Sequence, residues 1–107
     1  MNIYDQRLDQ LVDILREFKP ERVYAYGSWV KGGAGEESDI DLALVVGKGV
    51  DTLDLKKKLA LRLWERKYPF DLEPDVQVVA RDVFDYRLSR GDPFISNIAQ
   101  GRLVYGS

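Results

Sequence analysis

The chain contains neither cysteine nor histidine among its 107 residues. Without cysteine it can form no disulfide, no thiolate nucleophile and no zinc–thiolate site. Without histidine it lacks the side chain most often used as a general base and as a transition-metal ligand. Any acid–base or metal chemistry must therefore rest on carboxylates, which favour hard cations such as Mg²⁺ or Mn²⁺.

Long apolar runs and a surplus of basic residues are also missing. No stretch approaches the roughly 18 consecutive apolar residues of a membrane span, so we expect no membrane association. The formal net charge is -2, whereas free-standing nucleic-acid binders are usually basic, so we expect no strong intrinsic binding of nucleic acid. The first five residues show neither the basic nor the apolar region of a secretory signal, and we expect a cytoplasmic protein.

The length and the apolar content together predict one packed domain. A chain of 107 residues leaves room for a single domain, residues 1–107, and its 45% of apolar residues can supply a core. Alternating helical and extended patterns predict an α/β or α+β domain with a mixed β-sheet flanked by helices. The predicted strands are residues 22–26, 39–46, 75–80 and 102–105, and the predicted helices lie before Pro20, within 28–35, after Asp51, over 82–90, and from Pro93 to Gly101.

Two helices can be described in more detail. Asp51 or Thr52 can cap the start of one helix, and Asp92 followed by Pro93 is typical of the start of another. The first of these helices is predicted to bury one apolar face and to expose its lysines. The buried face comprises Leu55, Leu59, Ala60, Leu63 and Trp64, and the solvated side comprises Lys56, Lys57 and Lys58.

A Gly27-Ser28 pair directly follows the strand predicted over residues 22–26. Glycine lets the backbone approach a ligand closely, and amide groups at a helix start can bind phosphate oxygens together with a serine hydroxyl. An ordinary strand-to-helix turn with a serine cap would have the same sequence, so the pair alone leaves both interpretations open.

Two aspartates, Asp39 and Asp41, open the next predicted strand. Residues two apart on a strand point to the same face, so their carboxylates lie side by side while Ile40, Leu42 and Leu44 point to the opposite, apolar side. Neighbouring carboxylates repel one another unless a cation lies between them, which favours a divalent metal site. Solvated charges at an exposed strand end are the alternative.

Taken together, Gly27-Ser28, ten further residues and Asp39-x-Asp41 match the signature of the nucleotidyltransferase superfamily that includes DNA polymerase beta and kanamycin nucleotidyltransferase. The segment 27–42 most closely resembles the minimal nucleotidyltransferases of that superfamily. Lys31 stands near a position where arginine is frequent, and Trp29 stands where a smaller or basic residue is common. Neither departure removes the expected metal ligands.

The resemblance implies a third carboxylate on a later strand. Asp75 is the favoured candidate, because it starts an apolar strand. Asp71 and Glu73 are competing candidates from a loop bracketed by prolines. The alternative for Asp75 is that it only occupies a turn after Pro74. The resemblance further implies ATP as substrate, two Mg²⁺ or Mn²⁺ ions held by the three catalytic aspartates, and Asp75 as the proton acceptor. The nucleotide-binding residues that it implies are Gly27, Ser28, Lys31 and Ser38.

The resemblance also implies a partner and an acceptor. Minimal nucleotidyltransferases resemble the antitoxin half of a toxin–antitoxin pair, whose HEPN-family toxin is modified with AMP on a tyrosine. The rival interpretations are an antitoxin that neutralises its partner by masking alone, and a nucleotidyltransferase with a small-molecule acceptor. Each of these three interpretations is compatible with a homo-oligomer or a hetero-oligomer. Apolar and aromatic side chains that could anchor the partner are Trp29, Tyr86, Phe94 and Ile95, although Phe94 and Ile95 could instead close the core.

Overall fold

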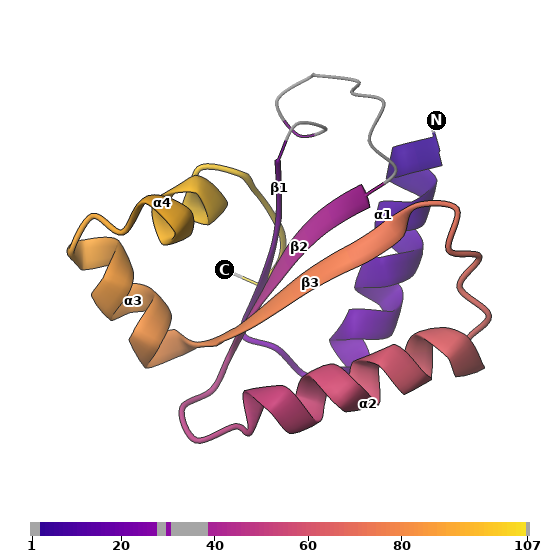
Figure 1. Ribbon diagram of the computed structural model, residues 1–107, viewed down its shortest axis with the longest axis horizontal. Coiled ribbons are helices and arrows are strands. Elements are labelled where there is room, and N and C mark those ends of the chain that lie inside the picture. The colour runs from indigo at the N-terminus through magenta and orange to yellow at the C-terminus, as the bar shows by residue number, and fades with distance from the viewer. Residues whose placement is uncertain (1–2, 28–29, 31–38, 107) are drawn as a thin grey trace.

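The computed structural model of the chain describes residues 3–27, 30 and 39–106. It contains a mixed four-stranded β-sheet with helices on both faces (Figure 1). Its architecture confirms the predicted α+β class. In chain order the elements are α1 (Ile3–Leu15), a 3₁₀ turn (Arg16–Phe18), β1 (Arg22–Tyr26), β2 (Asp39–Val46), α2 (Thr52–Glu65), β3 (Glu73–Ala80), α3 (Arg81–Ser89), α4 (Pro93–Ala99) and β4 (Arg102–Gly106). The helix predicted within residues 28–35 lies outside the described residues.

The strands are ordered β3-β2-β1-β4 across the sheet. β1 runs antiparallel to both β2 and β4, whereas β2 and β3 are parallel and are joined through α2. A parallel pair requires such a crossover, because the chain must return to the same end of the sheet. The starts of β2 and β3 therefore lie at the same end of the sheet as the end of β1.

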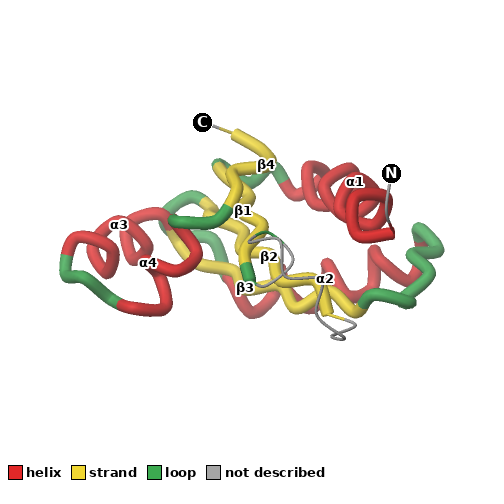
Figure 2. Tube along the Cα trace, turned by 90° about the horizontal axis from the view of Figure 1, so that it is seen from above, coloured by secondary structure: helices red, strands yellow, loops and turns green. Residues whose placement is uncertain are grey.

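The two faces of the sheet are covered by different helices. Figure 2 shows α1 and α2 on one side of the strands and α3 and α4 on the other. The alternation of side chains along β2 assigns Ile40, Leu42 and Leu44 to the core beneath α1 and α2, and Ala43 and Val45 to the core beneath α3 and α4. The predicted orientation of Ile40, Leu42 and Leu44 is thus confirmed.

Side-chain caps begin α2 and α4. The Asp51 carboxylate accepts a hydrogen bond from the amide of Asp54 at 3.0 Å, and the Asp92 carboxylate accepts one from the amide of Ile95 at 2.9 Å. Each bond satisfies an amide that has no partner inside the helix. Both predicted starts are therefore confirmed, with Asp51 rather than Thr52 as the cap.

The apolar face predicted for α2 is partly wrong. Leu55, Leu59 and Leu63 are buried as predicted, but Ala60 is exposed and Trp64 is 75% exposed. The three leucines follow one another at intervals of four residues and form a line along the helix. Ala60 and Trp64 come one residue later, which rotates them by about 100° toward solvent.

The prediction for the start of β3 is also wrong, because the strand begins at Glu73 rather than Asp75. Pro74 has no N–H to donate, and the residues from Pro69 to Pro74 were predicted to form a loop. β3 lies at an edge of the sheet, where one side of the backbone needs no partner strand, so proline is tolerated there.

The apolar residues that were predicted to anchor a partner differ in burial on α3 and α4. Ile95 is fully buried, which confirms that it closes the core, whereas Phe94 is 42% exposed and Tyr86 is 64% exposed. Within the described ranges, no helix has the length and the apolar composition needed to cross a membrane.

Candidate functional site

The predicted acidic residues lie on one face at one end of the sheet. Asp41 on β2 pairs in register with Asp75 on the parallel strand β3. Because Asp39 precedes Asp41 by two residues, all three side chains project from the face that α3 and α4 cover. That face is less covered near these strand starts, since Asp39 and Asp75 are exposed and Asp41 is half-buried.

Glu73 lies closer to this site than predicted. It belongs to β3, pairs in register with Asp39, and projects from the same face as Asp75. The other competitor, Asp71, is held elsewhere: both of its carboxylate oxygens accept hydrogen bonds from Arg7 of α1, at 2.6 and 2.7 Å. The Arg7 guanidinium lowers the pKa of Asp71, so this carboxylate serves to attach the loop before β3 to α1.

Gly27 brings the backbone into contact with Asp41. Its φ angle is +93°, in a region that side-chain-bearing residues rarely adopt, and a Cβ atom at this position would lie 2.5 Å from Oδ2 of Asp41. A larger residue would therefore be strained and would have to displace the Asp41 carboxylate from its place against the end of β1. This approach is to a carboxylate of the chain itself, and the approach of the Gly27 backbone to a phosphate stays a prediction.

Tyr26 belongs to this site although the sequence did not single it out. It pairs in register with Asp41, so that Tyr26, Asp41 and Asp75 form one row across three strands. The side chain is 7% exposed and its ring meets Phe94 edge-on, with the centroids 6.3 Å apart. Burial, with smaller contributions from the carboxylates of Asp41 and Asp75, raises the pKa of Tyr26 to about 12.

Tyr26 could not have been identified from the sequence alone, although it stands directly before Gly27. The last residue of β1 must lie beside the start of β2 when the two strands are antiparallel neighbours. That pairing is a tertiary feature, and a tyrosine next to a glycine gives no local sign of it.

A second polar side chain orients Asp75. Gln77, two residues later on β3 and on the same face, donates a hydrogen bond from Nε2 to Oδ1 of Asp75 at 3.2 Å. Amide donors of this kind fix the rotamer of a carboxylate without neutralising its charge. The bond therefore limits the directions that the Asp75 carboxylate samples.

The donor set suits a hard divalent cation, because it consists of carboxylate oxygens in adjacent register positions. With the side chains as they stand, the described residues include no group of three or more acidic side chains that could hold a metal ion. Convergence of Asp39, Asp41 and Asp75 on one ion stays a prediction. Ser28, Lys31 and Ser38, and likewise Trp29, lie outside the described residues.

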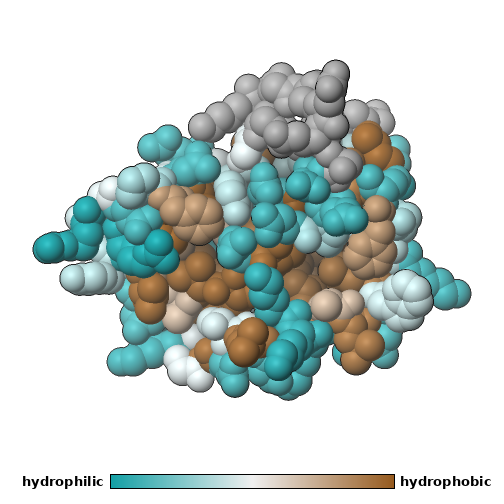
Figure 3. Space-filling view, in the orientation of Figure 1, coloured by the Kyte–Doolittle hydropathy of each residue, from teal (hydrophilic) through white to brown (hydrophobic). Residues whose placement is uncertain are grey.

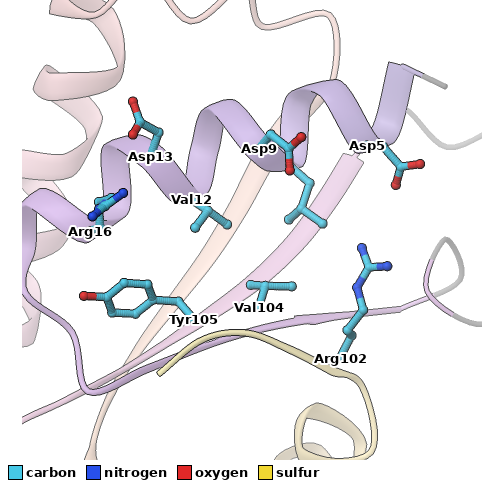
Figure 4. Close-up of a pocket in the computed structure, with 9 residues that line it drawn as sticks. Asp5, Asp9, Val12, Asp13, Arg16, Arg102, Val104 and Tyr105 are labelled. Atoms are coloured by element: carbon cyan, nitrogen blue, oxygen red, sulfur yellow. The ribbon is translucent and has the colours of Figure 1, made fainter. Parts of the chain in front are cut away.

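A groove of about 650 Å³ lies apart from these acids, between α1 and β4 (Figure 4). Asp5, Asp9 and Asp13 line it from α1, and Arg102 and Tyr105 line it from β4. It opens on the side of the sheet that α1 covers, whereas Asp39, Asp41 and Asp75 project from the other. Volume alone does not define a reaction site, and the groove contains none of the predicted catalytic residues.

Comparison with known proteins agrees with the geometry. The family described as Polymerase beta, Nucleotidyltransferase matches residues 9–107, which include every element from α1 to β4 in whole or in part. No curated protein and no solved structure matches the chain. The match extends over nearly the whole sequence, including the glycine and the three aspartates, and supports a nucleotidyltransferase-type function. The chain belongs to the polymerase beta nucleotidyltransferase family.

Proposed function

We propose that the chain is a metal-dependent nucleotidyltransferase that transfers AMP from ATP to a tyrosine hydroxyl of a HEPN-family toxin, for which it serves as antitoxin. The observation that carries the catalytic part is the row formed by Tyr26, Asp41 and Asp75, with Asp39 on the same face. Three carboxylates at the open end of one sheet face suit phosphoryl chemistry, which depends mainly on positioning and charge stabilisation.

Each aspartate has a defined task in this proposal. Asp39, Asp41 and Asp75 would hold two Mg²⁺ or Mn²⁺ ions, which supply charge neutralisation for the phosphates and activation of the acceptor oxygen. Asp75, kept in place by Gln77, would accept the proton of the acceptor hydroxyl. That oxygen bonds to the α-phosphorus while the bond to the β-phosphate breaks, so AMP is transferred and pyrophosphate leaves.

The surface beside the acids supports a protein as the acceptor. Phe94, 42% exposed, contacts Tyr26 of the row, and Tyr86, 64% exposed, lies on the adjacent helix α3. Exposed aromatic side chains are common anchors of protein interfaces. The acidic balance of the chain disfavours a polyanionic acceptor such as RNA.

Transfer of label tests the proposal. The chain is incubated with labelled ATP, Mg²⁺ and either the product of the adjacent gene or RNA. We expect label on a tyrosine of the protein, none in EDTA, and none with the Asp41→Asn variant. Label found only on RNA ends, or on a small molecule, would show that the acceptor is wrongly assigned.

A parallel assay separates chemistry from masking. The toxic activity of the partner is measured after mixing with wild-type chain or with Asp41→Asn, each with and without ATP. Catalytic neutralisation requires ATP and the intact aspartate. Equal neutralisation by both chains without ATP would support the non-catalytic antitoxin instead.

A further inference from the structure

The outer edge of β3 is an open side of the sheet. Among the described strands, β3 pairs only with β2, so one side of its eight-residue backbone has no strand beside it. Figure 1 looks directly onto this edge, with α2 below it and α3 beside it. An unpaired edge presents a row of N–H and C=O groups that can bind another strand.

Glu73, Pro74 and Asp75 protect the start of this edge against strand pairing, but the second half of the strand lacks such protection. From Val76 to Ala80 it carries no charge, whereas natural edge strands are commonly short, bulged or interrupted by charged residues. β4, at the other edge, has those features: it is five residues long, and its register with β1 shifts between Val23 and Tyr24. The uncharged stretch from Val76 to Ala80 is therefore the less protected of the two edges.

Apolar surface continues from the edge onto both flanking helices. Figure 3, in the orientation of Figure 1, shows apolar side chains gathered across the middle of the molecule over β3. An apolar groove of about 110 Å³ runs between α2 and β3, lined in part by Ala60 and Val76. Trp64, 75% exposed, lies one helical turn beyond Ala60, and Val83 at the start of α3 is 44% exposed. Interfaces of stable complexes require such flanking area in addition to a strand pair.

The charges at the two ends of β3 favour a second copy of the chain as the strand that pairs with this edge. Glu73 and Asp75 stand at the start of the strand, and Arg81 follows its end, where it pairs with Glu21 at 2.9 Å. If β3 of a second copy runs antiparallel to β3 of the first, Arg81 of the second copy lies beside the acidic strand start of the first. Arg81 of the first copy then lies beside the acidic strand start of the second. A twofold axis makes both contacts at once, which is how a self-complementary interface is built.

Pro74 fixes which groups face outward. Because proline has no N–H, Pro74 must be one of the residues whose backbone points away from β2, and alternate residues Val76, Val78 and Ala80 share that orientation. Two antiparallel registers then give full overlap. One sets Val78 opposite Val78 and Asp75 opposite Arg81; the other sets Gln77 opposite Gln77 and Glu73 opposite Arg81.

We infer that two copies of this chain associate through their β3 edges, in antiparallel orientation, to form one continuous eight-stranded sheet. The dimer brings Arg81 of the second copy to the acidic strand start that contains Asp75. It covers the apolar edge and leaves β4 and the α1 groove uncovered. This inference concerns an assembly of the chain with itself and does not depend on the proposed reaction.

Ala80→Pro is the sharpest disrupting variant. The φ angle of Ala80 is already −67°, close to the value that proline imposes, so the change keeps the fold and removes one outward N–H. Ala80→Ser is the matched control, because it retains that N–H. Over a concentration series in sedimentation velocity, wild type and Ala80→Ser should be dimers and Ala80→Pro a monomer with an unchanged circular dichroism spectrum. Arg81→Glu should weaken the dimer about twofold to fivefold.

Single cysteines test the geometry, since the chain has none of its own. Residues opposite one another on antiparallel strands have Cα atoms about 4.5–5.5 Å apart, within disulfide range. Val78→Cys or Gln77→Cys should form a covalent dimer on oxidation, according to the register, and Lys57→Cys on the solvated side of α2 should not. A wild type that stays monomeric throughout the series, or a dimer that neither cysteine links, would overturn the inference.

Discussion

The two faces of the sheet differ in how completely helices cover them. In the described part of the chain, the core beneath α1 and α2 contains 17 buried residues, and the core beneath α3 and α4 contains 6. α1 and α2 have 13 and 14 residues, against 9 and 7 for α3 and α4. The smaller cover leaves the strand starts open on the side where the aspartates project. Most of the buried core thus lies on one face, and the candidate catalytic aspartates project from the other.

The largest expected effect is on the rate of nucleotidyl transfer, and it should come from Asp41→Asn on the face beneath α3 and α4. Removing one carboxylate charge from the row should lower nucleotidyl transfer at least about a hundredfold, the scale of losing one preorganised charge-stabilising group. The free energy of unfolding should hold or rise slightly, because repulsion between Asp41 and its acidic neighbours is relieved. Initial rates and urea unfolding measure the two quantities.

Asp71→Asn is the control for that comparison, because Asp71 is bound to Arg7 and stands outside the row. It should leave the transfer rate within about twofold of wild type, since Arg7 keeps a hydrogen-bonding partner there. Similar losses of activity in both variants would mean that the faces are not separated as described.

A cavity in the larger core should have the next largest effect, this time on stability. Leu11 of α1 is fully buried, so Leu11→Ala should lower the free energy of unfolding by about 2–5 kcal/mol. Transfer per folded molecule should be unchanged at low temperature, because Leu11 lies in the core beneath α1 and α2, whereas Asp39, Asp41 and Asp75 project from the opposite face of the sheet. A loss of rate beyond the loss of folded protein would contradict this.

The equivalent cavity beneath α4 should affect both properties. Ile98 is also fully buried, but it packs with Tyr26 in the smaller core. Ile98→Ala should lower the free energy of unfolding by about 2 kcal/mol, near the lower limit for such changes. The reason is that short helices at the surface can relax into the cavity that the substitution leaves. The same relaxation should move Tyr26 and slow transfer several-fold. Unchanged kinetics would show that α4 does not position the row.

Alkaline pH should weaken the larger core through Tyr68. Tyr68 is 4% exposed and donates its hydroxyl hydrogen to the carbonyl of Leu72. Burial, and secondarily the charge of Asp71, raises the pKa of Tyr68 to about 12 from 10.0. A raised pKa means that the hydroxyl contributes fully below pH 10 and loses its contribution as the pH rises through about 12.

Tyr68→Phe measures that contribution. At neutral pH the variant should be less stable by about 1 kcal/mol, the net value of a typical hydrogen bond. Denaturant unfolding between pH 8 and about 12 should show the difference shrinking and then reversing sign. A difference that is constant with pH would mean that Tyr68 ionises normally in the folded chain.

The smallest effect should come from the cap of α2. Asp51→Ala removes the acceptor for the amide of Asp54 and should cost about 1 kcal/mol without changing transfer. Asp51→Ser, which can cap in the same way, is the matched control and should retain most of the stability. Thermal unfolding followed by circular dichroism can resolve a change of this size.

The sequence predicted those features that local chemistry determines. β1 and β2 have the predicted bounds, because glycine and proline punctuate them, and Asp51 and Asp92 cap their helices as predicted. The pairing of Asp41 with Tyr26 could not be predicted, since register depends on which strands become neighbours. That Asp41 and Asp75 lie near one another was implied by the family resemblance and not by local chemistry. The start of β3 was missed because Pro74 is compatible with a strand only at an edge.

The position of β4 has a consequence for synthesis of the chain. Among the described strands, β4 leaves the ribosome after the other three, yet it pairs with β1, which leaves before them. β1 can pair with β2 soon after both emerge, but its other side stays bare until residues 102–106 arrive. During that interval the growing sheet has two open edges, and a ribosome stalled before Arg102 would hold a chain prone to join its neighbours on the same message.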